Sequence, residues 1–195
     1  MTFTRIFLYL LLLLMPLGNL TRLPFGTVAV TINDFLLPVL IVSWIILVML
    51  GRKEIKLPPM SRWLILFVFW AFITLVAGLR YIGLTELLVS SLYLVRWIEY
   101  SFVFIIVYNE VSLEKVADGF SNLSSKLLQI LLWGQFAFVL LGFVQYLLFP
   151  NFSSFVVHGW DPHFYRLLST FLDPNFAGLF IILGAVLAIS LLLFI

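Results

Sequence analysis

The chain contains no cysteine, and only 10% of its 195 residues are charged. The missing thiols exclude disulfide bonds and thiolate metal sites. An ordinary soluble domain is about one quarter charged and about half apolar, whereas 64% of this chain is hydrophobic. The composition therefore excludes an ordinary soluble domain. It predicts an integral membrane protein whose helices are surrounded by lipid instead of water.

Several functional motifs are also missing. The sequence has no phosphate-binding loop, dinucleotide-binding fingerprint, HExxH zinc motif or nucleophile elbow. Its basic residues form no stripe, so nucleic acid is not an expected partner. His158 and His163 share no helical face, and Asp161 alone stands near them as a third ligand, so we expect no metal and no cofactor. One of these imidazoles could act as a general acid or base, or both could be interfacial polar residues.

Apolar segments long enough to cross a bilayer, which takes about 20 residues, occur six times. Their approximate ranges are 5–20, 32–50, 63–79, 87–108, 127–149 and 176–195. No long Ser/Gly-rich linker separates them, so we expect one transmembrane domain over residues 1–195, folded as an all-α polytopic helical bundle. The chain ends in an apolar run, and we therefore expect it to be truncated. The first segment could instead be a signal peptide, although no A-x-A-like cleavage site follows Leu17.

The distribution of basic residues predicts the orientation in the membrane, because cytoplasmic loops carry an excess of Lys and Arg. Seven lie in the loops on one side: Arg5, Arg52, Lys53, Lys56, Arg62, Lys115 and Lys126. Three lie on the other side, namely Arg22, Arg80 and Arg166. We therefore expect a cytoplasmic N-terminus, with the loops 19–31, 80–86 and 150–173 facing outward.

Arg96 and Glu99 are two charged residues inside the fourth predicted span. Spaced i and i+3, they share a helix face and could form an ion pair. A charge at the centre of a bilayer costs about 2.5–3.5 kcal/mol on insertion scales, and such residues commonly mark functional sites. The pair either fixes helix packing, or it lines a polar cavity or supports a ligand-binding arginine.

The segment before the sixth span combines basic, hydroxyl and helix-capping residues. Asp173 is expected to cap the span, with Pro174 at the first helical position. Arg166, Ser169 and Thr170 could fold beside the positive end of this helix and bind an anion there. The charge of Asp173 would compete with that anion. The alternative is a simple helix cap, with Arg166 reaching toward lipid headgroups.

The outward loop 150–173 is rich in aromatic residues, namely Phe152, Phe155, Trp160, Phe164, Tyr165 and Phe171. Such a segment suits the membrane interface, where it could contact an isoprenoid chain or simply anchor the loop. Arg80, in another outward loop, could join Arg166 in neutralising a pyrophosphate. Asp34 is expected to cap the second span.

The stretch from Arg166 to Gly178, RLLSTFLDPNFAG, resembles the arginine-to-Pro-Asn signature of the O-antigen ligase and polymerase family of bacterial membrane glycosyltransferases. The RWIEY segment that begins at Arg96 and the order of short spans also resemble the N-terminal half of that family. The resemblance implies transfer of a glycan from an undecaprenyl-diphosphate carrier to a lipid or sugar hydroxyl. The reaction would take place at the outer face of the bacterial cytoplasmic (inner) membrane, where Arg166 would neutralise the leaving diphosphate.

The candidate substrate-binding residues are Arg166, Ser169, Thr170, Asn175, Arg80 and Arg96, with Glu99 and Asp173 in supporting roles. The family's general base is a histidine in a large outward loop of its second half. This chain has no such loop, so the base stays unassigned and we expect the chain alone to lack the catalytic loop. The expected partners are the lipid-linked glycan, its acceptor and membrane lipids.

Two other classes of function remain open. A transporter or flippase for a lipid-linked or amphiphilic substrate would use Arg96 and Glu99 at the midplane, commonly between broken helices. The fourth predicted span contains no Gly or Pro, which disfavours such a break. A non-catalytic membrane subunit that packs against a partner is the second alternative.

Overall fold

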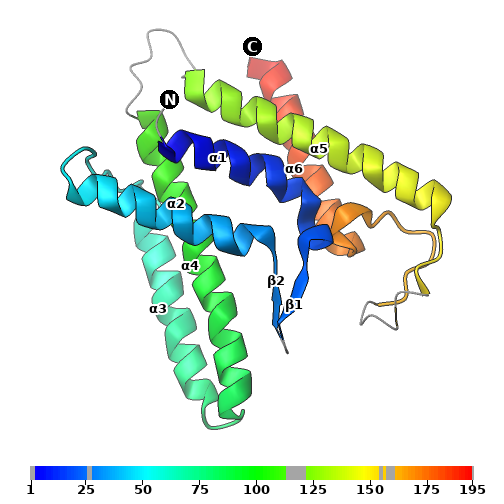
Figure 1. Ribbon diagram of the computed structural model, residues 1–195, viewed down its shortest axis with the longest axis horizontal. Helices are drawn as coiled ribbons and strands as arrows, with labels where there is room; N and C mark the ends of the chain where they lie inside the picture. Colours follow the sequence, from blue (N-terminus) through cyan, green and yellow to red (C-terminus); the bar gives the residue numbers. More distant parts are fainter. Residues whose placement is uncertain (1–2, 26–27, 113–121, 154–155, 157–160, 195) are drawn as a thin grey trace. The chain divides into compact units, whose positions relative to one another are not determined.

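The computed structural model describes residues 3–25, 28–112, 122–153, 156 and 161–194. Within these residues it contains six helices that are long and apolar enough to cross a membrane (Figure 1). The chain is therefore a multi-pass, all-α membrane protein, and the prediction of six spans is confirmed. Predictions that concern Lys115, Phe155, His158 and Trp160 lie outside the described residues.

The six helices are α1 (Phe3–Leu14), α2 (Ile32–Met49), α3 (Ser61–Gly78), α4 (Leu84–Ser112), α5 (Asn122–Leu148) and α6 (Pro174–Phe194). A 3-10 segment, η1 (Met15–Thr21), continues the first span and contains a kink at Gly18, where φ is 48° and ψ is −127°. The predicted bounds are too short for α4 at both ends and for the start of α5. Hydropathy marks only the apolar part of a helix, whereas polar residues with hydrogen-bond partners extend it further.

A small hairpin, not predicted from the sequence, lies between η1 and α2. Strand β1 (Leu23–Phe25) pairs antiparallel with β2 (Val28–Val30), with Leu23 opposite Val30. Helix α2 follows at once, and Thr31 is its N-cap. The Asp34 carboxylate accepts hydrogen bonds from the Thr31 amide (2.6 Å) and hydroxyl (2.9 Å). Asp34 thus helps to begin the helix, as expected, but as the third helical residue of a capping box and not as the cap itself.

The described residues form two compact units. Unit 1 comprises residues 1–8 and 23–124, and unit 2 comprises residues 9–22 and 125–195. Each unit is described by itself.

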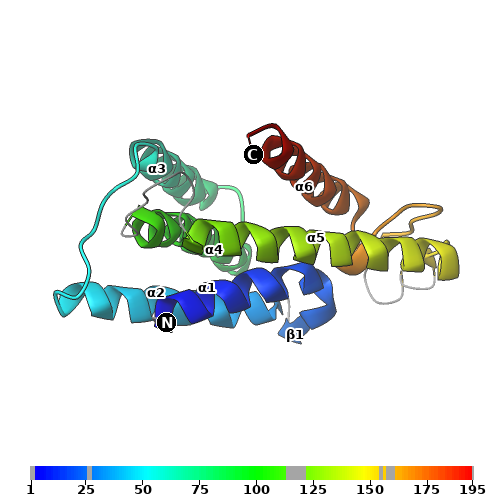
Figure 2. The same ribbon diagram turned by 90° about the horizontal axis from the view of Figure 1, so that it is seen from above.

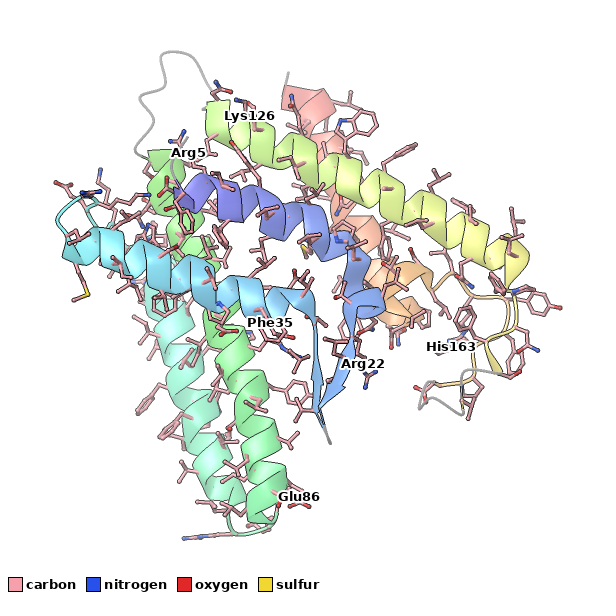
Figure 3. The ribbon with its side chains drawn as sticks, in the orientation of Figure 1. Arg5, Arg22, Phe35, Glu86, Lys126 and His163 are labelled. Atoms are coloured by element: carbon pink, nitrogen blue, oxygen red, sulfur yellow. The ribbon has the colours of Figure 1, made fainter. Side chains whose placement is uncertain are left out.

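Unit 1 is built on the α3–α4 hairpin, whose helices lie side by side in both views (Figures 1 and 2). Helix α2 packs against α4, and Leu37, Leu40 and Trp44 of α2 are buried together with Ile106 of α4. In α3 most side chains are exposed and apolar, which suits contact with lipid. Arg5 and Glu86 lie at opposite ends of the unit (Figure 3).

Unit 2 has an aromatic core where α5 meets α6. Phe138 and Phe180 are buried, and their rings contact each other and that of Phe171 at centroid distances of 4.6–5.2 Å. Each such pair contributes about 0.5–1.5 kcal/mol beyond area burial. The buried Gln135 adds a hydrogen bond from its Nε2 to the Phe180 carbonyl (3.1 Å). Ring packing and interhelical hydrogen bonds are the forces that associate helices where lipid removes the hydrophobic drive.

Candidate functional site

The start of α6 confirms the prediction made for Asp173. The helix begins at Pro174, and the Asp173 Oδ1 accepts hydrogen bonds from the amides of Asn175 (2.8 Å) and Phe176 (3.0 Å). The amide of Ala177 donates to the Asp173 carbonyl at 3.0 Å. Because proline has no amide hydrogen, every amide of this first turn is accounted for.

This cap changes the expected anion site. Helix N-termini bind phosphates through amides that lack an intrahelical partner, and Asp173 already accepts from the two that would serve here. The groups that remain available are side chains. Arg166 and Asn175 are both exposed, and neither side chain has a hydrogen bond or ion pair within the described part of the chain.

Ser169 and Thr170 are buried, at 5% and 3% exposure. The Ser169 hydroxyl donates to the Phe138 carbonyl at 2.6 Å, and the Thr170 hydroxyl donates to the carbonyl of Pro16. Both hydroxyls that were predicted to donate to a ligand therefore donate to backbone carbonyls of unit 2. That the two residues bind substrate stays a prediction, and the contacts in the structure hold the segment in place.

The backbone around Arg166 is held in an unusual conformation. Tyr165, Ser169 and Leu172 have positive φ values of 50°, 50° and 56°. A non-glycine residue in this region costs about 1–3 kcal/mol and persists only where its surroundings determine it. In this protein the surroundings that fix the segment are Gln145 of α5 and Asn19 of η1, which both hydrogen-bond to it.

The expected pairing of Arg96 with Glu99 is wrong. Arg96 instead forms a fork with Asp34 of α2, with Nε–Oδ1 at 2.6 Å and Nη2–Oδ2 at 2.8 Å. Its Nη2 also donates to the Ala29 carbonyl of β2 at 3.1 Å. The carboxylate of Asp34 is already oriented by the capping box, so both of its oxygens meet the planar guanidinium. Arg96 thereby joins α4 to α2 and to the hairpin.

The remaining predicted residues form no ion pair with these groups in the described part of the chain. Glu99 is half-buried on α4 and has no ion pair among the residues that the structure describes. Arg80, just beyond α3, is exposed and belongs to unit 1, whereas Arg166 belongs to unit 2. A joint role for Arg80 and Arg166 stays a prediction.

A buried ionic cluster at one end of unit 1 was missed by the sequence analysis. Glu110 is 1% exposed, forms an ion pair with Lys53, and has the Arg5 Nε at 3.6 Å from its Oε2. Lys53 also donates to the Thr4 hydroxyl (3.3 Å). Burial, and secondly the Arg5 charge, lower the pKa of Lys53 below its usual value. This cluster gathers basic residues that the sequence places on one side of the membrane.

The remaining predictions concern the histidines and a metal site. His163 lies in the loop between α5 and α6 (Figure 3), and its carbonyl accepts from the Phe152 amide (3.0 Å). In the part of the chain that the structure describes, no three His, Asp or Glu side chains gather as metal ligands.

Fold and site together define a polytopic membrane helical protein with an exposed arginine on a constrained segment. Comparisons with protein-family models, with curated proteins and with solved structures find no match.

Proposed function

We propose that Arg166 binds a lipid-linked diphosphate, and that the chain is part of a membrane glycosyltransferase of the O-antigen ligase and polymerase type. Its donor would be a glycan on undecaprenyl diphosphate. Its acceptor would be a sugar or other hydroxyl at the outer face of the bacterial cytoplasmic membrane.

One observation carries this proposal. Arg166 is exposed and unpaired within the described residues, yet its neighbours Tyr165 and Ser169 have positive φ and are fixed by hydrogen bonds. An arginine that only anchors a loop in lipid headgroups needs no such constraint, because it reaches them through its flexible stem. A guanidinium presented from a fixed backbone suits bidentate recognition of phosphate.

The reaction would place the diphosphate beside Arg166. The acceptor hydroxyl oxygen attacks the anomeric carbon of the donor sugar and forms the new glycosidic bond. The bond between that carbon and the diphosphate oxygen breaks, and undecaprenyl diphosphate leaves with the electron pair. A base must take the hydroxyl proton, and we assign none here. Arg166 would stabilise the negative charge that develops on the departing diphosphate.

The exposed Asn175 amide would add a donor to a phosphate oxygen. Ser169 and Thr170 would support the site by holding the backbone, in agreement with their burial. Arg96, engaged with Asp34, would act as a brace of unit 1.

The transporter alternative receives no specific support. It needs a free midplane charge near a broken helix. Glu99 has no ion pair among the described residues, but α4 is one unbroken helix from Leu84 to Ser112, and the Arg96 guanidinium is occupied by Asp34 and Ala29.

The test uses the full-length protein in proteoliposomes, with a photoreactive undecaprenyl-diphosphate analogue to measure binding and a glycan-loaded donor to measure transfer. A hydrogen bond to a charged group contributes about 1.5–3 kcal/mol, so Arg166→Ala should weaken binding roughly 10- to 100-fold. Arg166→Lys should retain part of the affinity, because lysine keeps the charge but loses the fork.

Arg52→Ala is the matched control, because Arg52 is also exposed but lies in the α2–α3 linker. It should leave binding and transfer unchanged. Normal binding by Arg166→Ala, or an equal loss in the control, would remove Arg166 from the proposed role.

A further inference from the structure

One face of α5 contacts the segment that carries Arg166. Phe138, Gly142 and Gln145 are spaced i, i+4 and i+7, so they lie on one side of the helix. We call these three residues the α5 seat. All of their contacts with the segment lie within unit 2.

Gln145 uses both ends of its side-chain amide. Its Oε1 accepts hydrogen bonds from the amides of Leu168 (2.9 Å) and Ser169 (3.3 Å), and its Nε2 donates to the Phe149 carbonyl (3.1 Å). The orientation of the amide is consistent, because the oxygen faces two donors and the nitrogen faces an acceptor.

The other two residues of the α5 seat bring the segment close to the helix backbone. A Cβ placed on Gly142 would lie 2.6 Å from Leu167 Cδ2 and 3.1 Å from Ser169 Cβ. The Phe138 carbonyl accepts from the Ser169 hydroxyl at 2.6 Å. A side chain at 142 would therefore press on Leu167 and Ser169 at this close approach.

Arg166 lies between two fixed points. Upstream, the Tyr165 amide donates to the Pro150 carbonyl at 2.8 Å. Downstream, Leu168 and Ser169 are held by Gln145. The upstream hydrogen bond joins two backbone groups. The downstream hydrogen bonds are accepted by the side chain of Gln145, which a substitution can remove.

We infer that Gln145 is a positioning residue for Arg166, which fixes the backbone that presents the guanidinium to its anionic ligand. The inference that the ligand is a lipid diphosphate rests on the proposed function. The positioning of residue 166 by Gln145 does not.

The first experiment is therefore independent of any ligand. These 195 residues contain no cysteine, so a nitroxide attached to the Arg166→Cys variant of this chain reports mobility at this position alone. Adding Gln145→Met, which keeps the length and removes the acceptor, should mobilise the label severalfold. Gln145→Glu should restore an immobile label, because its carboxylate still accepts from both amides. Gln129→Met, on the same helix but without a contact to the segment, should have no effect.

The second experiment measures binding of the photoreactive undecaprenyl-diphosphate analogue by the full-length protein. Gln145→Met should weaken binding about tenfold, as expected when one charge-assisted contact is lost. In an Arg166→Ala background the same substitution should have no further effect, because Gln145 acts through the arginine. A general loss of structure would lower binding in both backgrounds. Gly142→Ala, which pushes the segment away from the seat, should reproduce the effect of Gln145→Met.

The outcomes separate the two claims. An immobile nitroxide after Gln145→Met, or equal losses of binding in the two backgrounds, would overturn the positioning role. Normal binding by Arg166→Ala together with a mobilised label would instead overturn the proposed function and leave the positioning role standing.

Discussion

Arg96→Met is expected to destabilise unit 1 through its effect on Asp34, and the geometry of the pair sets the size of the loss. The two side chains form a fork at 2.6 and 2.8 Å and are 33% and 15% exposed. Exposed ion pairs contribute about 0–1 kcal/mol, whereas breaking a buried pair costs about 3–5 kcal/mol. This pair lies between those limits, so we expect a coupling energy of about 2 kcal/mol.

A double-mutant cycle measures that coupling. The free energy of unfolding is determined by denaturation with sodium dodecyl sulfate in mixed micelles, followed by circular dichroism, for Arg96→Met, Asp34→Asn and the double variant. Asp34 also accepts from Thr31, so its substitution disturbs the cap of α2. This loss is present in both arms that carry Asp34→Asn and cancels from the coupling energy.

The matched control is a second cycle with Arg96→Met and Glu99→Gln, which tests the pair that the sequence favours. Arg96 and Glu99 are neighbours at i and i+3 on α4, so their charges alone should give a coupling of only about 0.2–0.5 kcal/mol. A larger coupling to Glu99 than to Asp34 would refute the reasoning, because the fork would then not be the dominant contact of Arg96.

Three further substitutions test other contacts through the free energy of unfolding, and the second also through the protease sensitivity of the α2–α3 linker. Asp173→Ala should cost about 1 kcal/mol, because α6 loses its cap, whereas Asp173→Asn should keep most of that energy; equal losses would contradict the cap. Asn109→Ala should cost about 2–3 kcal/mol, because the Asn109 side chain makes three hydrogen bonds, two of them to the backbone of the α2–α3 linker. If the linker is no more sensitive to protease in this variant, these bonds do not hold it in place. Gly184→Ala should cost about 1–3 kcal/mol, because the Gln135 amide occupies the place of the new Cβ. In its control Gly178→Ala, where nothing lies within 4 Å, the helix should be unchanged or slightly more stable.

The spans and the start of α6 could be predicted because each depends on neighbouring residues. Length and hydropathy define a span, and the Asp-Pro pair at 173–174 defines a helix start within three residues. Both predictions agree with the structure. The hairpin of β1 and β2 was missed because its strands have only three residues each, too few for a visible alternation.

Contacts between distant segments could not be predicted in this way. The i and i+3 rule suggested Glu99 for Arg96, whereas the actual partner, Asp34, lies 62 residues away. Thr170 and its acceptor carbonyl on Pro16 are separated by 154 residues. A hydroxyl that looks available in the sequence can therefore be used entirely by the fold. Gln145 did carry a signal, since a polar amide inside an apolar span usually has a specific partner.

Exposure alone does not distinguish Arg166, because Arg52, Arg62 and Arg80 are exposed as well. The difference lies in the backbone that carries it. Three residues from 165 to 172 have positive φ, each at a cost of about 1–3 kcal/mol, and the segment keeps this conformation through hydrogen bonds to α5 and η1. Arg96 shows the opposite case, since its guanidinium is used by Asp34 and Ala29 within unit 1. A constrained backbone around one arginine whose guanidinium is unpaired within the described residues is the arrangement on which the proposed ligand contact rests.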